Sequence, residues 1–270
     1  MVAAILLAML QLPQNPSPMT ESTRAHIRLQ QAERPGTRHT LSLGILLVPP
    51  GKARTRPLVV HFHGAQWVAE TAAAKWRKSA ATLAVQVGSG SAVYQKAIGT
   101  GERFRKLLNE AEGQCACIFK PIYITSFSAG YGAIREILRD EESVRRVDGV
   151  ILADSLHASY TTGDKPGPVD GVGLEPFLNF ARLAAAGKKR MLVAHSEVFP
   201  GTYASTTETA GYLLEQLQIH RKPVLRWGAL GMQQVSNARK GRFQLRGFAG
   251  NSAPDHVDHF HALFAWLKAL

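Results

Sequence analysis

The sequence has little cysteine and no long apolar segment. Its two cysteines among 270 residues are Cys115 and Cys117, which a single residue separates. A disulfide between such close neighbours would close a very small ring, and no further metal ligands lie near them, so we expect two reduced thiols. No apolar run approaches the ~18 residues of a membrane-spanning helix, and the mean hydropathy is −0.08. These absences exclude a disulfide-stapled scaffold and a membrane-spanning protein.

Acidic residues are scarce relative to basic ones. The chain contains 20 Asp and Glu against 32 Lys and Arg, which gives a formal net charge of +12. The basic residues lie in small scattered groups, such as the one at 188–190, and form no stripe interleaved with aromatic residues. A solvated basic surface explains this pattern, so we expect no nucleic-acid partner. The charge favours anionic substrates or attachment to an anionic surface.

The first 21 residues are expected to be an apolar leader or linker ahead of one domain at 22–270. Residues 2–10 are continuously apolar and a proline-rich stretch follows, as in a secretory signal. The run lacks a preceding basic residue and a clear cleavage site. A start of translation at Met19 is a second interpretation of the same segment. We favour a cytoplasmic location over an exported one, and the sequence does not indicate an oligomeric state.

Strand and helix patterns alternate along most of the chain. Alternating residues at 24–30 and 40–48 predict an antiparallel hairpin with its turn at 34–36. Further strands are expected at 57–63, 83–87, 121–125, 148–153, 190–194 and 242–247, and helices at 70–83, 101–112, 129–140, 174–186, 205–217 and from 257. This order predicts an α/β fold: a mostly parallel, doubly wound sheet with an N-terminal antiparallel hairpin and helices on both faces. No large cap is expected, because the interval 154–176 is short and rich in Gly, Pro, Ser and Thr.

Reactive side chains follow several of the predicted strands, where open sheets of this kind bind ligands. The segment 122–133 is an apolar strand, a turn of small residues and then a helix, which is the layout of a nucleophile elbow. Ser128 would be the nucleophile at its centre. Ser126 and Gly130, two positions to either side, are small enough for the tight turn. The backbone N–H of Ala129 would lie beside a developing oxyanion.

With these motifs the sequence resembles the α/β-hydrolase superfamily, in particular its serine esterases and lipases. The resemblance extends from about residue 22 to the C-terminus, and it departs from the usual Gly-x-Ser-x-Gly motif in having Ser126 at the first glycine. The superfamily's His-Gly segment corresponds to His63-Gly64. The resemblance therefore implies a second oxyanion donor at the N–H of Ala65, or alternatively of Gln66.

The resemblance also implies where the histidine and the acid lie, because the superfamily orders its triad as Ser, acid and His. The histidine is expected after the last strand, so His256 is our first choice for the base and His259 the alternative. For the acid we favour Asp154, which ends the strand at 148–153. Glu197, after the strand at 190–194, is the alternative.

The expected function is therefore cleavage of carboxylic esters through an acyl-enzyme intermediate, without a cofactor or a metal. Two other classes remain open. The histidines at 61, 63, 256, 259 and 261 permit a metal-dependent hydrolase, and the altered elbow permits a binding scaffold without catalysis. Trp67 and Tyr131, close to the proposed site in sequence, are either walls of the cleft or core aromatics. The expected substrate is a small-molecule or polymeric ester, which the sequence does not define further.

Overall fold

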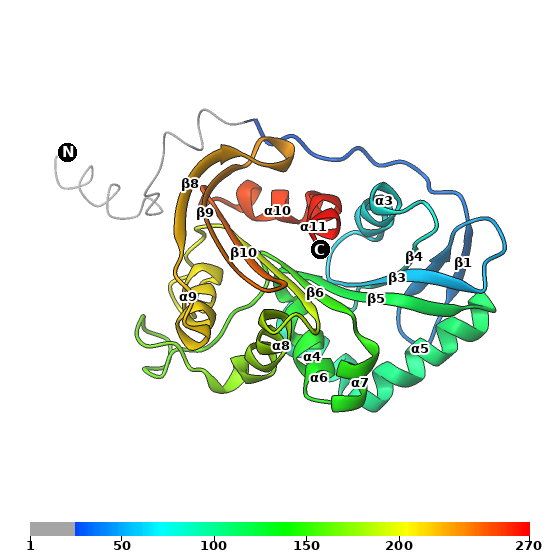
Figure 1. The fold of residues 1–270 in the computed structure, drawn as a ribbon, viewed down its shortest axis with the longest axis horizontal. Helices are drawn as coiled ribbons and strands as arrows, with labels where there is room; N and C mark the ends of the chain where they lie inside the picture. The colour runs from blue at the N-terminus through cyan, green and yellow to red at the C-terminus, as the bar shows by residue number, and fades with distance from the viewer. Residues whose placement is uncertain (1–24) are drawn as a thin grey trace, which may run out of the picture.

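The computed structural model of the protein describes residues 25–270 (Figure 1). The expected leader at 1–21, including the alternative start at Met19, lies outside the described residues. In the described part of the chain, no helix combines the length and apolar character needed to cross a membrane.

Ten strands form one mixed sheet in the order β1-β2-β4-β3-β5-β6-β7-β10-β9-β8. The strands are β1 (Thr37–Thr40), β2 (Ile45–Val48), β3 (Thr55–Phe62), β4 (Ala81–Val85), β5 (Ile118–Phe127), β6 (Gly149–Ala153), β7 (Arg190–His195), β8 (Lys222–Trp227), β9 (Gln233–Lys240) and β10 (Phe243–Phe248). The central strands from β4 to β10 pair in parallel. Antiparallel pairs extend the sheet at both ends. The sheet is therefore mostly parallel, as predicted.

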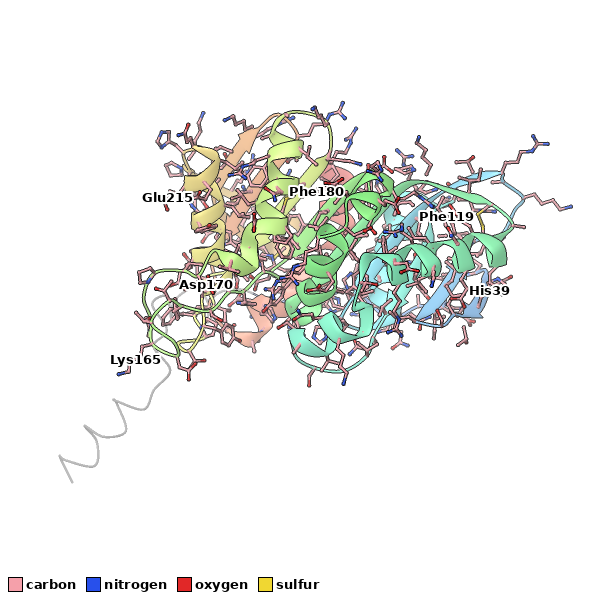
Figure 2. The ribbon with its side chains drawn as sticks, turned by 90° about the horizontal axis from the view of Figure 1, so that it is seen from below. His39, Phe119, Lys165, Asp170, Phe180 and Glu215 are labelled. Carbon is pink, nitrogen blue, oxygen red and sulfur yellow. A yellow bond between two sulfur atoms is a disulfide. The ribbon has the colours of Figure 1, made fainter. Side chains whose placement is uncertain are left out.

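Helices cover both faces of the sheet. One face carries α3 (Gln66–Trp76), α10 (Ala253–His261) and α11 (Leu263–Ala269) (Figure 1). The other carries α4 (Ser91–Ile98), α5 (Gly101–Cys115), α6 (Tyr131–Leu138), α7 (Glu141–Arg146), α8 (Glu175–Ala185) and α9 (Thr206–Leu217). Figure 2 looks onto this second helical layer. Between β6 and α8 the chain forms a loop with one short 3-10 turn at 172–174, so no helical cap is inserted there.

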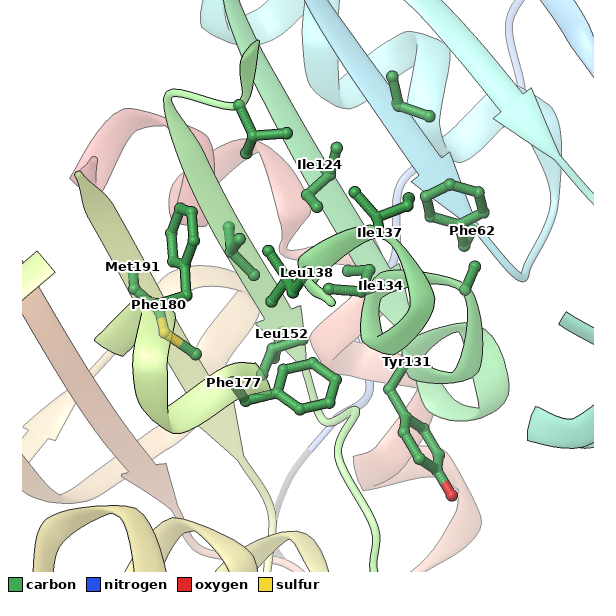
Figure 3. Packing of buried hydrophobic residues seen from close by; sticks show 14 of the residues in the cluster. Phe62, Ile124, Tyr131, Ile134, Ile137, Leu138, Leu152, Phe177, Phe180 and Met191 are labelled. Atoms are coloured by element: carbon green, nitrogen blue, oxygen red, sulfur yellow. The ribbon is translucent and has the colours of Figure 1, made fainter. Parts of the chain in front are cut away.

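The central strands are apolar because helices bury both of their faces. β4 and β6 are buried along their whole length. On the side of α6 and α8, Phe62, Ile124 and Leu152 from the sheet pack against Ile134 and Phe177 from the helices (Figure 3). A second core on the opposite face is built around Trp266 and Phe248. The two cores hold the carboxyl ends of the parallel strands in place, and the candidate site lies there.

The N-terminal hairpin differs from the prediction. It is formed by β1 and β2 with a turn at 41–44, and residues 25–31 form no strand. That segment runs instead along α10, where Arg28 Nε donates to Asp258 and the Leu29 amide donates to Nδ1 of His261. Hydrogen bonds to side chains of α10 thus hold this segment, in place of the backbone hydrogen bonds that a neighbouring strand would form.

The helix predicted at 70–83 and the strand at 83–87 are also shifted. The helix α3 spans Gln66–Trp76 and ends where Arg77 takes an extended conformation, so that β4 starts at Ala81. The short helices α4 and α7, the edge strand β8 and its neighbour β9 were not anticipated. β8 is almost entirely exposed and β9 carries mainly polar residues, so neither has an apolar pattern that predicts a strand.

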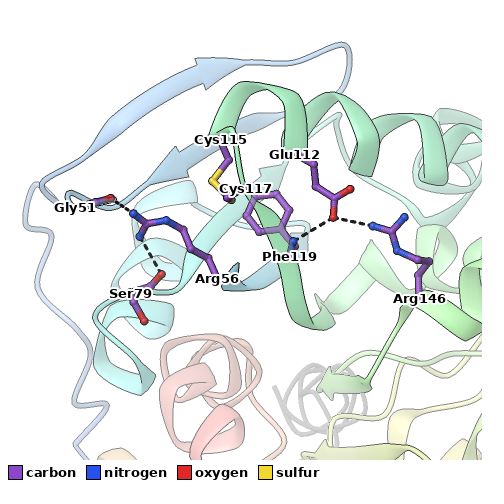
Figure 4. The surroundings of a disulfide bond; sticks show 8 residues. All are labelled: Gly51, Arg56, Ser79, Glu112, Cys115, Cys117, Phe119 and Arg146. Atoms are coloured by element: carbon purple, nitrogen blue, oxygen red, sulfur yellow. Dashed lines mark hydrogen bonds and ion pairs between the residues drawn. A yellow bond between two sulfur atoms is a disulfide. The ribbon is translucent and has the colours of Figure 1, made fainter. Parts of the chain in front are cut away.

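The cysteines form a disulfide, and the prediction of two reduced thiols is wrong (Figure 4). Cys115 ends α5, and Ala116 takes a left-handed conformation with φ 51°. This turn brings Cys115 and Cys117 to a Cα–Cα distance of 5.1 Å, within the usual range for a disulfide. The amide of Cys117 meanwhile donates to the carbonyl of Glu112 at the helix end. The small ring can form because the chain turns sharply at Ala116, where α5 ends.

Candidate active site

Ser128 lies on a tight turn between β5 and α6. Its φ is +46°, a left-handed conformation that is costly for a residue with a Cβ and that is found at functional turns. A 3-10 turn at Ser128–Gly130 leads directly into α6. A Cβ on Gly130 would lie 2.2 Å from the carbonyl oxygen of Phe62, so only glycine lets the turn pack against the end of β3. The backbone thus has the geometry of the predicted elbow.

The serine at position 126 has a partner of its own. Ser126 is buried, and its hydroxyl lies 2.7 Å from the hydroxyl of Ser155. Ser155 donates in turn to the carbonyl of Ser128, also at 2.7 Å. Since Ser155 must donate to that carbonyl, Ser126 donates to Ser155. The departure from glycine therefore adds a chain of hydrogen bonds that ties the elbow to the loop after β6.

Asp154 and His256 come together at this edge of the sheet. His256 Nδ1 lies 2.7 Å from Asp154 Oδ2, although 102 residues separate the two in sequence. A carboxylate only accepts, so Nδ1 carries the proton and Nε2 is free to accept one. The ring of Phe127, the residue before Ser128, lies 4.5 Å from the His256 ring between centroids. The elbow, the aspartate and the histidine therefore lie side by side.

Asp154 is fully enclosed and held in its charged form. Ser196 donates to it through both its amide (2.8 Å) and its hydroxyl (2.6 Å), and the Thr206 hydroxyl donates at 2.6 Å. Burial works to raise the pKa of Asp154. Electrostatic attraction to His259 and the hydrogen bonds and charge from His256 and Ser196 outweigh burial and hold this pKa well below its ordinary value. The carboxylate stays ionised at neutral pH and can orient His256.

The two alternative residues lie elsewhere. His259 is 1% exposed and its ring packs between Phe248 and Trp266, whereas the side chain of His256 is 24% exposed. Glu197 is exposed and accepts from the amide of Gly250 at 3.3 Å. The geometry thus favours the pair Asp154 and His256.

The turn after β3 carries Ala65 and Gln66 and is held by side chains from three elements. His61 Nε2 donates to the carbonyl of His63 at 2.7 Å, and His63 Nδ1 hydrogen-bonds the Tyr94 hydroxyl at 2.9 Å. Burial lowers the pKa of His61 to about 3, so the ring is neutral and its Nδ1 accepts from Thr125. Gln86 accepts from the amide of Gly64 at 2.7 Å.

These contacts define the two amides that could stabilise an oxyanion. In the part of the chain that the structure describes, neither the Ala65 nor the Ala129 amide donates to a protein acceptor. Ala65 is exposed and precedes α3, and Ala129 lies in the elbow. For the amide of Gln66, the alternative donor, the described residues likewise supply no acceptor, while its side chain donates to Glu70 at 2.6 Å.

A possible set of metal ligands lies away from the histidines that the sequence singled out. Among residues 25–270, His26, Asp255 and Asp258 each offer one ligand atom within 4.8 Å of the others. His26 Nδ1 pairs with Asp258 at 2.7 Å, and Asp255 accepts from the amide and the hydroxyl of Ser252 in a helix capping box. These protein contacts give the group a structural role in fixing the N-terminal segment to α10. His61 uses both ring nitrogens within the protein, as described above.

A pocket of about 260 Å³ opens beside Ser128, lined by Gly90, Ser91, Ser128, Ala129, Tyr131, His157 and Tyr203. Tyr131 lines this pocket and is also buried in the core on the side of α6, so both interpretations of the sequence apply to it. Trp67 packs instead against His261, with 5.6 Å between ring centroids.

Several residues of the site were missed from the sequence. Ser155, Ser196 and Thr206 hold Asp154 and the elbow, and Gln86 and Tyr94 hold the turn after β3. All are common polar residues in loops or at helix starts and belong to no motif. The one available signal was position, because Ser155 and Ser196 each follow a predicted strand directly.

Comparisons with known proteins show the fold. No protein-family profile and no curated protein matches the chain. Among solved structures, an ester hydrolase from the metagenome of Lake Arreo is similar with a TM-score of 0.52 and 12% identity, over 94% of this chain and 88% of that one. The poly(3-hydroxybutyrate) depolymerase LpqC from Bordetella parapertussis has a TM-score of 0.47 and 15% identity over 82% of this chain and 84% of its own. An acetyl xylan esterase from Aspergillus awamori has a TM-score of 0.46 and 12% identity over 82% of this chain and 93% of its own.

The topology of the sheet and the likeness to the Lake Arreo ester hydrolase agree. The chain has the α/β-hydrolase fold, as the sequence predicted. At this level of identity the likeness concerns the fold, and the chemistry must be argued from the residues of this chain.

Proposed function

We propose that the protein is a serine hydrolase that cleaves carboxylic esters, with Ser128 as nucleophile, His256 as base and Asp154 as the acid that orients it. The observation that carries this proposal is the 2.7 Å hydrogen bond between His256 and Asp154 beside the left-handed turn at Ser128. The α/β-hydrolase fold and its ester-hydrolase neighbours support the general reaction class.

The chemistry follows from the protonation of the pair. A serine hydroxyl is a weak nucleophile at neutral pH and needs a base to take its proton. With Nδ1 bound to Asp154, His256 accepts the proton of Ser128 at Nε2 while the serine oxygen bonds to the ester carbonyl carbon. His256 then returns the proton to the departing alcohol, and the acyl group remains on Ser128. A water molecule, activated by the same histidine, releases the acid and restores the serine.

The amides of Ala65 and Ala129 are the proposed donors to the oxyanion. Ala129 lies in the elbow and Ala65 lies in the turn that leads into α3, and among the described residues neither amide has a protein acceptor. Each preorganised donor of this kind lowers an acyl-transfer barrier by about 3 kcal/mol. The hydrogen bonds from His61, Gln86 and Tyr94 keep the Ala65 turn in place before the substrate binds.

The test is covalent labelling with a fluorophosphonate, read by intact mass, together with hydrolysis of 4-nitrophenyl acetate. We expect one adduct per chain and turnover in the wild type, and neither in Ser128→Ala. Ser159→Ala is the matched control, because Ser159 is an exposed serine on the neighbouring loop, and it should label and turn over like the wild type.

Two results would contradict the proposal. Folded wild-type protein that takes no adduct and hydrolyses no ester would favour a binding scaffold. An adduct that persists in Ser128→Ala would place the nucleophile at another residue.

A further inference from the structure

The pocket beside Ser128 is small, and polar side chains form much of its lining. Its volume is about 260 Å³, enough for a six-membered ring or a short acyl group. Besides Ser128, four of its side chains carry a group that forms hydrogen bonds: Ser91, Tyr131, His157 and Tyr203. Figure 3 shows the Tyr131 hydroxyl pointing away from the other labelled side chains of the apolar cluster. An unbranched hydrocarbon would leave these polar groups without partners.

One wall comes from the start of α4. Gly132 on α6 has no side chain, and a Cβ there would lie 2.1 Å from the carbonyl oxygen of Ser91. The missing side chain lets α4 approach the elbow, so that Ser91 and Gly90 line the pocket together with Ser128. The position of this wall therefore depends on the close packing of α4 against α6 at Gly132.

The opposite wall is built around His157. Its Nδ1 lies 3.0 Å from the carbonyl of Ala204, so Nδ1 is the protonated nitrogen. Burial lowers the pKa of His157, which keeps the ring neutral and makes Nε2 an acceptor. Among the described residues none donates to Nε2. The rings of Tyr131 and Tyr203 meet the imidazole edge-on at centroid distances of 5.8 and 5.1 Å.

The wall is held before any substrate arrives. Ala158 and Ala204 form an antiparallel bridge, and the Ala204 amide donates to the Ala158 carbonyl at 2.8 Å. The bridge joins the loop that carries His157 to the loop that carries Tyr203. A preformed wall loses little entropy on binding and can discriminate between similar groups.

From this geometry we propose that the pocket binds a small hydroxylated part of the ester substrate, with His157 accepting from a substrate hydroxyl and Tyr203 as its second hydrogen-bonding partner. This inference rests on the proposed function, because the pocket adjoins the proposed nucleophile. The shared chemistry is a hydroxyl-bearing group of few carbons, which occurs both in hydroxyacyl esters and in acylated sugars.

The experiment compares kcat/KM for two matched pairs of esters. The first pair is 4-nitrophenyl 3-hydroxybutanoate and 4-nitrophenyl butanoate, which differ in the acyl part. The second is methyl 6-O-acetylglucoside and cyclohexylmethyl acetate, which differ in the alcohol part. We expect the wild type to favour the hydroxylated member of at least one pair by about tenfold or more. The pair that shows the preference identifies which part of the ester enters the pocket.

Variants assign the preference to residues. His157→Asn keeps a donor for the Ala204 carbonyl but lacks the Nε2 acceptor. Tyr203→Phe removes one hydroxyl. Because Tyr203 is 44% exposed, this change should have little effect on folding. Each should reduce the hydroxyl preference several-fold. His220→Asn, the same change at an exposed histidine, should retain it.

The outcomes separate the two proposals. Equal rates within both pairs, or a preference that neither variant changes, would overturn the assignment of the pocket while leaving ester hydrolysis intact. No hydrolysis of any of these esters and no fluorophosphonate adduct would overturn the proposed function itself.

Discussion

Asp154 is the most heavily bonded side chain of the candidate site. Donors from the loop after β7, from the start of α9 and from α10 converge on its two oxygens. A carboxylate accepts at both oxygens, whereas an amide would have to present an NH₂ group to one set of these donors. The position therefore discriminates sharply between aspartate and asparagine.

We expect Asp154→Asn to reduce kcat for ester hydrolysis by about 10⁴-fold, because His256 would lose its orienting carboxylate. The buried donors left unsatisfied should also lower the free energy of unfolding by about 1–3 kcal/mol. Stopped-flow or steady-state hydrolysis and urea unfolding measure the two effects. The control is Glu197→Gln, which should stay near wild type. The opposite pattern, with Glu197→Gln inactive and Asp154→Asn active, would assign the acid to Glu197.

A second buried residue, His195, predicts how stability changes with pH. Its Nδ1 donates to the Ser196 carbonyl, and its Nε2 lies 2.7 Å from a guanidinium nitrogen of Arg221, so the ring is neutral. Burial and the charge of Arg221 lower the pKa of His195 from 6.5 to about 4. The unfolded chain therefore binds a proton below pH 6.5 that the folded protein does not bind until about pH 4. Stability is complete above pH 6.5 and falls as the pH drops toward 4.

For the wild type, this residue should account for a loss of about 2 kcal/mol between pH 8 and pH 5. His195→Gln keeps an acceptor for Arg221 and does not titrate. We expect its melting temperature to fall less over this interval, even if it starts lower at pH 8. Thermal unfolding in matched buffers measures the difference, with His220→Asn at the surface as control. An identical decline in wild type and His195→Gln would contradict the assignment.

At the scale of elements, the sequence predicted best where burial on both faces makes a strand continuously apolar. The strands β3, β5, β6 and β7 lie close to their predicted positions for this reason. The strands β8 and β9 were missed because β8 is the exposed edge strand of the sheet and β9, its neighbour, carries mainly polar residues. The segment 25–31 was misassigned because its alternation reflects contacts with α10, which only the tertiary structure defines.

The candidate site, like the fold, could be predicted only in part from the sequence. Ser128 and Asp154 stand directly after strands, and His256 lies near the start of α10, the helix that follows β10, so their order along the chain was enough to nominate them. Which acid faces which histidine depends on how two loops pack across the sheet edge, and local sequence carries no information on that. The sequence left Glu197 and His259 as rivals for this reason.

The disulfide gives a prediction for the end of α5. The oxidised protein, denatured without reductant, should show no thiol that reacts with Ellman's reagent. Because the bond closes a very short loop, it restricts the unfolded chain only a little, and its reduction should lower the free energy of unfolding by about 1–2 kcal/mol. Urea unfolding with and without a reductant measures this. A Cys115→Ala, Cys117→Ala double variant is the control and should not respond to reductant. Two reactive thiols in protein isolated under oxidising conditions would contradict the bond.

At the scale of the whole molecule, the excess of basic residues should affect encounter with substrate. A net charge of +12 attracts anions over a range that salt shortens. We expect kcat/KM for an anionic ester, 4-nitrophenyl hemisuccinate, to fall several-fold between about 20 and 500 mM NaCl. Hydrolysis of neutral 4-nitrophenyl acetate should stay nearly constant over that range. Parallel behaviour of the two esters would show that the surface charge does not steer substrate.

The bridge between Ala158 and Ala204 has a consequence for how this scaffold can be diversified. The loop after β6 supplies both Asp154 and His157. The loop after β7 supplies Ser196 and Tyr203 and leads to Thr206 at the start of α9. The proposed acid and the pocket wall therefore share one paired stretch of backbone. A graft that replaces either loop would therefore change the substrate selectivity of the pocket and the contacts around Asp154 at the same time. Residues 197–203, which are half-buried or exposed, are where insertions can vary the mouth of the pocket and leave the bridge in place.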